Sequence, residues 1–385
     1  MADREPPDGL AEAGLPDGLA EAFAHLGRLR FDHYMELALY APASGFFATT
    51  GGAGRREGDF ITSPEVGPLF GAVLADHLDE LWERLGRPEP FTVVECGAGR
   101  GALAISVRAA RPRCAPVLHW VMVERSDALR AEHGRHLELT PVVRPGAGAS
   151  PGHDAESTGP WFTSLASMPE RPVCGAVVAN ELLDNLPFRL LEHRGGRWFE
   201  VFVTPDPGQP GRLREELVAL DGDSWRLLAT LVPEPAEGAR LPWQAAATQW
   251  VGSALELLQR GEVIVFDYGA DTATLATRPQ ADWLRTYRSH SRGAGPLEQP
   301  GSQDITVDVA MDQLPAGAEH RTQGAWLRAN GIDRLVEEAQ VVWRERAGTG
   351  DLEAIRARSV PLEAEALTDP AGLGSFTVAT WQIGI

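Results

Sequence analysis

Acidic side chains and glycines of this chain gather where a predicted strand ends. Residues 91–95 form a short apolar run with β-branched members, which predicts a buried strand that stops at Glu95. Gly97, Gly99 and Gly101 follow at alternate positions, and an alanine-rich helical pattern begins after them. A strand that turns into a helix through glycines lets a ligand approach the bare backbone. This stretch therefore predicts a binding site for a nucleotide-like cofactor, and its alternative is a plain strand–turn–helix corner.

The spacing of the glycines separates two classes of cofactor. Dinucleotide-binding turns usually read GxGxxG, and their helix N-terminus faces a pyrophosphate. This chain reads ExGxGxG, the form associated with S-adenosylmethionine. That cofactor carries a sulfonium and an ammonium, so an acid at the strand end attracts it, whereas the same acid repels a pyrophosphate.

A second acid follows the next predicted strand. Residues 118–124 form another apolar run, and its last residue, Glu124, lies 124 − 101 = 23 positions after Gly101. A carboxylate at this place can accept hydrogen bonds from both ribose hydroxyls of a bound nucleoside. The alternative is an ordinary surface glutamate at the start of a helix, and we favour the ribose role.

Asn180, Glu181 and Asp184 follow a third apolar run, residues 176–179. Glu181 and Asp184 are three residues apart, so their carboxylates share a face of a helical turn. Such a pair could hold a guanidinium through paired hydrogen bonds, and one member could act as a base if burial raised its pKa. The alternative is that both acids only stabilise the N-terminal end of a helix. We favour a role in binding the substrate.

The elements that position these residues alternate along the chain. Strands are predicted at residues 91–95, 118–124, 176–179, 198–203, 262–266 and 375–383, the last at an edge or in a hairpin. Helices are predicted at residues 31–40, 65–86, 102–110, 127–137, 243–259, 325–330 and 352–358, with Ser126 as a cap. The alternation predicts an α/β fold with a mainly parallel sheet, whose ligands bind beyond the carboxyl ends of the strands. Asp267 and Tyr268 are expected at the same edge.

The chain divides into five predicted segments. They are a disordered tail at 1–17, a helical N-terminal segment at 18–86, a cofactor-binding core at 87–187, a small β insertion at 188–242, and the remaining core with acceptor-side elements at 243–385. The insertion is predicted from alternating strands and turns that end in a cluster of prolines.

Composition excludes several classes of function. The chain of 385 residues has a formal charge of −19 and contains no long basic run, so nucleic acid is not an expected partner. The acidic surface would suit a basic peptide or protein, although solubility explains it equally well. All basic residues apart from histidine are arginine, which excludes a lysine Schiff base or a P-loop lysine. The ten histidines show no metal-binding spacing, so no metal is expected.

Cysteine usage and hydropathy predict the compartment. The three cysteines lack any pairing pattern and are expected to be reduced. The N-terminus is acidic without an apolar signal core, and no run approaches the length of a membrane span. We therefore expect a cytoplasmic protein without membrane partners.

Motifs along the chain resemble those of the MidA family of class I S-adenosylmethionine-dependent methyltransferases. They are FDHYMELALYAPASGFF (31–47), GDFITSPEVGPLFG (58–71), VVECGAGRGAL (93–103), ANELLDNLPFRL (179–190) and then, in family order, VIVFDYG, LRTYRSH, PGSQDIT, TQGAWLRANGI and GSFTVATWQI. The resemblance spans about residues 24–383. It implies a Rossmann-like fold and S-adenosylmethionine as the cofactor.

The resemblance also implies roles for individual residues. Cofactor contacts are implied for Thr62, Ser63, Pro64, Glu95, Gly97, Ala98, Gly99, Gly101, Glu124, Arg125 and Asn180. Catalytic roles are implied for Asp59, Asn180, Glu181, Asp184 and His290, with residues 59–65 as a cover over the pocket. Positions near the acceptor are implied for Asp267, Tyr268, Arg285, Tyr287 and His290.

The implied activity is methylation of a protein arginine, because the family's mitochondrial member methylates an arginine of a respiratory complex I subunit. Two alternatives stay open. One is a small-molecule O-methyltransferase in which His290 or Asp59 manages the proton. The other is a cofactor-binding assembly factor with little turnover. A nicotinamide oxidoreductase is disfavoured by the glycine spacing, and a homodimer is among the expected partners.

Overall fold

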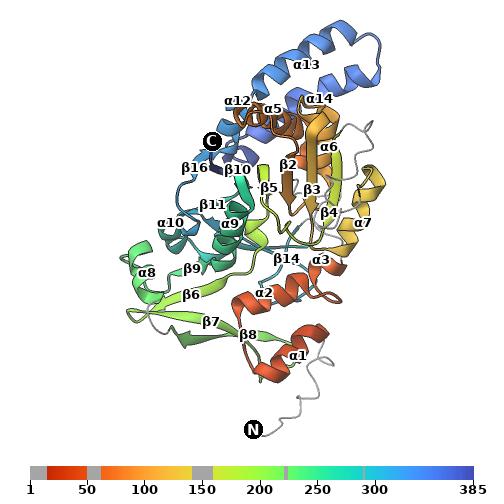
Figure 1. Cartoon of the computed structure of the whole chain (residues 1–385). Coiled ribbons are helices and arrows are strands. Elements are labelled where there is room, and N and C mark those ends of the chain that lie inside the picture. Colours follow the sequence, from red (N-terminus) through yellow and green to blue (C-terminus); the bar gives the residue numbers. More distant parts are fainter. Residues whose placement is uncertain (1–14, 50–61, 141–158, 221–223, 289–290) are drawn as a thin grey trace. The chain divides into compact units, whose positions relative to one another are not determined.

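The computed structural model describes residues 15–49, 62–140, 159–220, 224–288 and 291–385 (Figure 1). The chain forms two compact units. Unit 1 contains residues 1–60, 183–251 and 269–316, and unit 2 contains residues 61–182, 252–268 and 317–385. Each unit therefore combines segments that are distant in the sequence. The five predicted segments are continuous ranges of the sequence and do not correspond to these units one to one.

Unit 2 is built on a seven-stranded sheet. Its strand order is β16 (Glu319–Thr322), β17 (Thr377–Ile383), β10 (Leu258–Asp267), β5 (Val173–Asn180), β2 (Phe91–Cys96), β3 (Leu118–Val123) and β4 (Trp161–Leu165). The five strands from β10 to β4 are mutually parallel, whereas β17 runs antiparallel to both β10 and β16. The predicted α/β fold is confirmed, and the mainly parallel sheet is confirmed in part, because this sheet is mixed.

Helices enclose this sheet because its strands are apolar on both faces. All six residues of β2 are buried, as in parallel sheets that are covered on both sides. The helices of unit 2 are α4 (Ser63–Val66), α5 (Pro68–Arg84), α6 (Ala102–Ala110), α7 (Asp127–His136), α12 (Gln323–Ala329), α13 (Ile332–Arg346) and α14 (Leu352–Thr368). Leu74, Leu78 and Leu81 form one buried stripe of α5 at helical spacing.

The register of the parallel strands brings their carboxyl ends together. Cys96 at the end of β2 is paired with Val123 of β3 and with Ala179 of β5. Asn180 at the end of β5 is paired with Phe266 of β10. The segments that follow β2, β3, β5 and β10 therefore emerge at one edge of the sheet, as the sequence predicted.

Unit 1 contains the predicted β insertion together with residues of the other four predicted segments. Its largest sheet joins β1 (Leu29–Arg30), β7 (Arg197–Pro205), β6 (Arg189–Arg194) and β9 (Arg240–Trp243) in that order, with β8 (Leu213–Ala219) paired to β7. A second sheet has the order β13 (Ser291–Arg292), β12 (Leu284–Arg288) and β14 (Asp304–Val307). β11 (Gly269–Ala270) pairs with β15 (Val309–Ala310).

Aromatic packing holds the core of unit 1. Its helices are α1 (Asp17–Leu26), α2 (Phe31–Tyr40), α3 (Phe46–Thr49), α8 (Ser224–Leu231), α10 (Thr272–Thr277) and α11 (Gln280–Trp283). The residues of α9 (Ala245–Leu257) are divided between the two units. The ring of Phe31 lies 5.1 Å from the ring of Phe188, and both side chains are fully buried. This contact ties α2 to the chain that enters β6.

The structure corrects several predicted elements. The helix expected at 65–86 is two helices, α4 and α5, because the chain is extended at Gly67. The strand expected at 375–383 is β17, and it lies inside the sheet because β16 pairs with its outer side. The helix expected at 352–358 continues to residue 368. The strands β4, β12, β14 and β16 and the helix α13 were not predicted.

Candidate functional site

The glycine loop between β2 and α6 folds back onto the end of β3. The backbone N–H groups of Gly97 and Ala98 both donate to the carbonyl oxygen of Val123, at 2.9 and 3.1 Å. Gly99 and Gly101 have φ angles of 55° and 82°, a region that side chains other than glycine rarely adopt. Among the described residues, no atom outside Gly99 and its two chain neighbours lies within 4 Å of the position that a Cβ of Gly99 would take. These residues therefore leave the backbone of the loop uncovered at Gly99, as a cofactor site requires.

Glu124 is joined to this loop by a hydrogen bond. Its Oε2 accepts from the N–H of Gly99 at 2.9 Å, and its Oε1 accepts from the N–H of Ser126 at 2.8 Å. Burial raises the pKa of Glu124, and these backbone donors oppose the shift because they stabilise the carboxylate. A backbone hydrogen bond from Arg125 also stabilises the carboxylate and opposes the shift. Arg125, the next residue, is exposed and offers its carbonyl oxygen to Arg130.

Glu95 lies at the end of β2 and is buried, with an exposed fraction of 5%. Its Oε2 accepts a hydrogen bond of 2.7 Å from the indole Nε1 of Trp120 on β3. Burial raises the pKa of Glu95 to about 8, and the nearby charge of Glu124 adds to the shift. The carboxyl group of Glu95, the first acid of the motif, is therefore buried and bonded to the neighbouring strand β3.

His133 also touches the glycine loop, and sequence reasoning missed it. It lies on α7, and its Nε2 is 2.9 Å from the carbonyl oxygen of Gly99. No motif or spacing in the sequence marks this residue, because the loop is 34 positions away. Only the packing of α7 beside β4 brings the ring to the loop.

Thr62, Ser63 and Pro64 begin the short helix α4. The hydroxyl of Thr62 and the side chain of Glu65 form a reciprocal capping box. The hydroxyl of Ser63 is fully buried and donates to Oε1 of Gln323 at 3.0 Å. α4 packs against α6, the helix that follows the glycine loop. Asp59 and His290, both predicted as catalytic, lie outside the described residues.

Asn180 is the last residue of β5, and Glu181 follows it. Nδ2 of Asn180 donates to Oε1 of Glu181 at 3.1 Å. The backbone of Glu181 is in the left-handed region, with a φ of 50°, and its N–H donates to the carbonyl oxygen of Phe266. A non-glycine residue in this region is uncommon and is found most often at functional sites and tight turns. In the same unit, Asp267 is the last residue of the adjacent strand β10, and Tyr268 follows it.

Asp184 belongs to unit 1 and lies beside a second buried carboxyl group. It is in a 3₁₀ turn, Leu183–Asn185, and its Oδ2 accepts from the hydroxyl of Thr306 at 2.6 Å. Asp304, two residues before Thr306 on β14, accepts from Nδ2 of Asn185 at 3.0 Å. Burial raises the pKa of Asp304 to about 7, and the charge of Asp184 contributes to the shift. Sequence reasoning missed Asp304, Thr306 and Asn185.

Arg285 and Tyr287 lie on β12, opposite these residues of β14. Arg285 is paired in register with Thr306, and Tyr287 is paired with Asp304. Cross-strand partners share a face of a sheet, so the predicted residues and the buried acid lie on the same face. Nη2 of Arg285 donates to Asp308 at 2.7 Å. The structure thus brings Asp184, Arg285 and Tyr287 together within unit 1.

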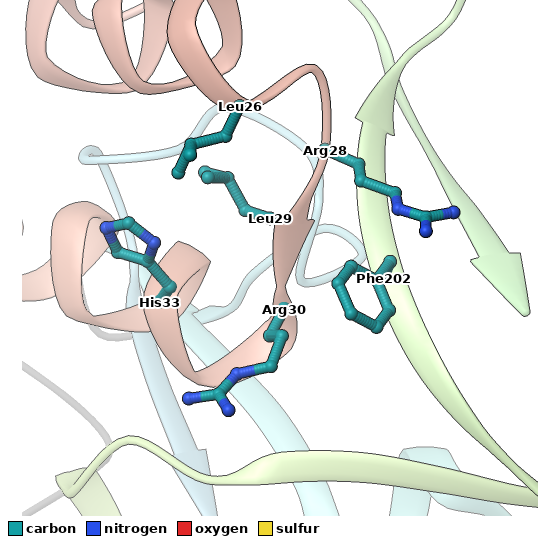
Figure 2. A pocket seen from close by; sticks show the side chains of 6 residues that line it. All are labelled: Leu26, Arg28, Leu29, Arg30, His33 and Phe202. Carbon is teal, nitrogen blue, oxygen red and sulfur yellow. The ribbon is translucent and has the colours of Figure 1, made fainter. Parts of the chain in front are cut away.

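A surface cavity of about 430 Å³ lies elsewhere in unit 1 (Figure 2). Its lining residues are Leu26, Arg28, Leu29, Arg30, His33 and Phe202. The guanidinium of Arg28 lies over the ring of Phe202 and also pairs with Glu216. None of the predicted site residues that the structure describes lines this cavity, and its arginines are neutralised by neighbouring acids.

No three His, Cys, Asp or Glu side chains in the described ranges gather closely enough to hold a metal ion. In the same part of the chain, every helix is too short or too polar to cross a lipid bilayer.

Comparisons with known proteins identify relatives over most of the chain. A family model described as "Putative S-adenosyl-L-methionine-dependent methyltransferase" matches residues 73–328. A mitochondrial protein arginine methyltransferase NDUFAF7 homolog of Drosophila melanogaster is 28% identical over 369 residues, which cover 91% of this chain and 80% of the relative. The human mitochondrial protein arginine methyltransferase NDUFAF7 is 26% identical over 332 residues, which cover 80% and 71%.

A solved structure is similar over the whole chain. It is a protein of Burkholderia thailandensis described as a "likely methyl transferase" bound to S-adenosyl-homocysteine. It superposes with a TM-score of 0.77 at 28% identity, covering 100% of this chain and 96% of its own.

The expected cytoplasmic location is contradicted by these relatives, because the curated proteins are named as mitochondrial. The expectation rested on unpaired cysteines and on the absence of an apolar signal core. Neither feature distinguishes one reducing compartment from another.

Proposed function

Because the chain belongs to a family of S-adenosylmethionine-dependent methyltransferases, we propose that it methylates a guanidinium nitrogen of an arginine in a protein substrate. The observation that carries the choice of acceptor is the name of the relatives, which are protein arginine methyltransferases at 26–28% identity over 80–91% of this chain. Two groups of described residues fit the two halves of this reaction.

The residues of the cofactor half fit S-adenosylmethionine. No described residue other than its chain neighbours occupies the space beside Gly99, which suits a ligand against the backbone, and the carboxylate of Glu124 suits ribose hydroxyls. Glu95 contributes a carboxyl group at the strand end, and ionisation of this group would complement a cationic ligand. We assign Thr62, Ser63, Pro64, Gly97, Ala98, Gly101, Arg125 and Asn180 to the same half.

The residues of the acceptor half fit a cation. Asp184 and Asp304 are both nearly buried, and each already accepts one hydrogen bond from a neighbouring side chain. Two carboxyl groups at such a site attract a guanidinium, whose planar N–H groups can bind a carboxylate with two parallel hydrogen bonds. Glu181 also stays a predicted catalytic acid.

The cofactor, when bound, supplies a methyl group on a sulfonium, and the acceptor nitrogen takes it by in-line displacement. The chain's own residues must orient the nitrogen and dispose of a proton. An arginine that gains a methyl group and stays cationic releases one N–H proton. Asp304 suits this task because its pKa of about 7 lets it take up a proton near neutral pH.

Transfer of a labelled methyl group into lysate tests the proposal. Label is expected in protein, and hydrolysis of that protein is expected to yield methylarginine. Label only in small molecules would replace the proposal with the O-methyltransferase alternative. Binding of S-adenosyl-homocysteine without any transfer would favour the assembly-factor alternative.

Substitution of the two buried acids tests the acceptor half. Asp184→Asn and Asp304→Asn are expected to lower the transfer rate by about 100-fold or more while the affinity for S-adenosyl-homocysteine stays within about threefold. Glu298→Gln, on an exposed acid of unit 1, serves as the matched control. Transfer at the wild-type rate by both variants would remove this cluster from the acceptor site.

The predicted homodimer also stays a proposal. Sedimentation of the purified chain at several concentrations tests it directly.

A further inference from the structure

His133 is fully buried although it lies on α7, the most polar helix around the glycine loop. Its two ring nitrogens have different partners. Nε2 is 2.9 Å from the carbonyl oxygen of Gly99, and Nδ1 is 2.8 Å from the hydroxyl oxygen of Ser164 on β4.

The partners fix the tautomer of the ring. A carbonyl oxygen can only accept, so Nε2 of His133 must carry the proton and donate to Gly99. Burial lowers the pKa of His133, which favours the neutral ring. In the neutral ring Nδ1 accepts, and the hydroxyl of Ser164 can rotate to donate to it.

Gly99 is consequently held on both sides. Its N–H donates to Glu124, and its carbonyl accepts from His133. The position has a φ of 55° and no side chain that could pack, so these two hydrogen bonds set the orientation of both adjoining peptide groups. The contact from Glu124 belongs to the expected ribose-binding residue, whereas the contact from His133 comes from a helix without any assigned role.

We propose that His133 is a positioning residue for cofactor binding, which holds the Gly99 carbonyl so that the glycine loop keeps its receptive conformation. The inference rests on the proposed assignment of this loop to the cofactor. His133 acts through Gly99 and does not take part in the methyl transfer itself.

Packing alone is the competing explanation. A Cβ on Gly101 would lie 3.4 Å from Cδ2 of His133, so the ring also fills space beneath the loop. A test must therefore separate the hydrogen bond from the volume of the side chain.

Two amide variants make that separation. In His133→Gln the amide nitrogen can take the place of Nε2 and donate to Gly99, whereas in His133→Asn it can take only the place of Nδ1. Both replacements are polar, unbranched at Cβ and smaller than histidine. Titration calorimetry of the full chain with S-adenosyl-homocysteine gives the affinity, and thermal unfolding without ligand gives the stability.

We expect His133→Gln to bind S-adenosyl-homocysteine within about threefold of the wild-type protein. We expect His133→Asn to bind at least about tenfold more weakly, because it leaves the Gly99 carbonyl without its donor. The two variants should unfold at similar temperatures. With an acceptor in hand, His133→Asn should raise the KM for S-adenosylmethionine more than it lowers kcat.

Equal affinities of the two variants would overturn the proposal. This includes the case in which both bind normally and the case in which both fail to fold, because either result assigns the ring to packing only. Failure of the wild-type protein to bind S-adenosyl-homocysteine would instead contradict the proposed function. Failure of the His133 proposal and failure of the proposed function can therefore be told apart.

Discussion

Glu95 is the first residue of the ExGxGxG motif, yet its carboxyl group is buried and bound to Trp120. The motif alone predicted an ionised acid that faces a cationic ligand. The structure adds that ionisation is costly here in the absence of a ligand, because burial and the charge of Glu124 both oppose it. The ionisation of Glu95 therefore changes near pH 8, well above the pH at which an exposed glutamate ionises.

This sensitivity predicts how folding stability depends on pH. The pKa of Glu95 is raised from 4.5 to about 8, so the folded protein binds more protons than the unfolded chain between these values. The free energy of unfolding should therefore fall as pH rises through this window, by at most about 1.4 kcal/mol per pH unit from this group. Glu95→Gln keeps an acceptor for Trp120 and should flatten the dependence. Urea unfolding at pH 5, 6.5 and 8 measures it.

Glu170→Gln provides the control, because Glu170 is an exposed acid of the same unit. It should keep the wild-type pH dependence. A Glu95→Gln protein with the same slope as this control would show that Glu95 does not titrate in this window.

At the scale of elements, the sequence predicted those strands, loops and helix caps that a short local pattern marks. β2, β3, β5 and β10 each contain an apolar run, and the loop after β2 is marked by its glycines, so the strands and the loop were found without a structure. The hydroxyl of Ser126 caps α7 as expected, by accepting from the N–H of Leu129.

The elements that were missed depend on partners far along the chain. β12 and β14 are short and acquire their strand character from each other, with Leu284 paired to Val307 across a loop. Asp304 reaches the neighbourhood of Asp184 only through this pairing, since 120 residues separate them in the chain. His133 approaches Gly99 in the same way, through the packing of a helix. No local pattern could have found either residue.

A hydrogen bond between α14 and α5 is predicted to stabilise the fold. Glu363 of α14 is buried, and its Oε2 accepts from the N–H of Leu69 in the first turn of α5 at 3.0 Å. Gly67 before this turn has no side chain to act as a cap, so α14 supplies it. Glu363→Ala should lower the free energy of unfolding by about 1–2 kcal/mol. A lower urea midpoint with an unchanged slope would be the signature.

Glu365→Ala, on an exposed residue of the same helix, should change the stability by less than about 0.5 kcal/mol. If the two alanine variants are equally stable, the cap from α14 contributes nothing measurable.

At the scale of the whole molecule, the net charge of −19 bears on the choice of substrate. A surface of one sign attracts partners of the opposite sign and speeds their encounter, and this attraction weakens as salt shortens the Debye length from about 30 Å at 10 mM to about 3 Å at 1 M. A protein acceptor that presents an arginine among other basic residues would benefit from this field. If the acidic surface served only solubility, the protein would show no preference for a basic acceptor.

The charge therefore predicts a difference between two matched peptides that carry the same target arginine. With basic flanking residues, the KM should be at least about tenfold lower than with acidic ones at low salt, since the acidic peptide is repelled. The difference should shrink strongly between 10 mM and 1 M salt, whereas kcat should change little, because the field acts on encounter rather than on the aligned complex. Steady-state methyl transfer at several salt concentrations measures both constants. Equal KM values that do not respond to salt would leave the acidic surface without a role in choosing the acceptor.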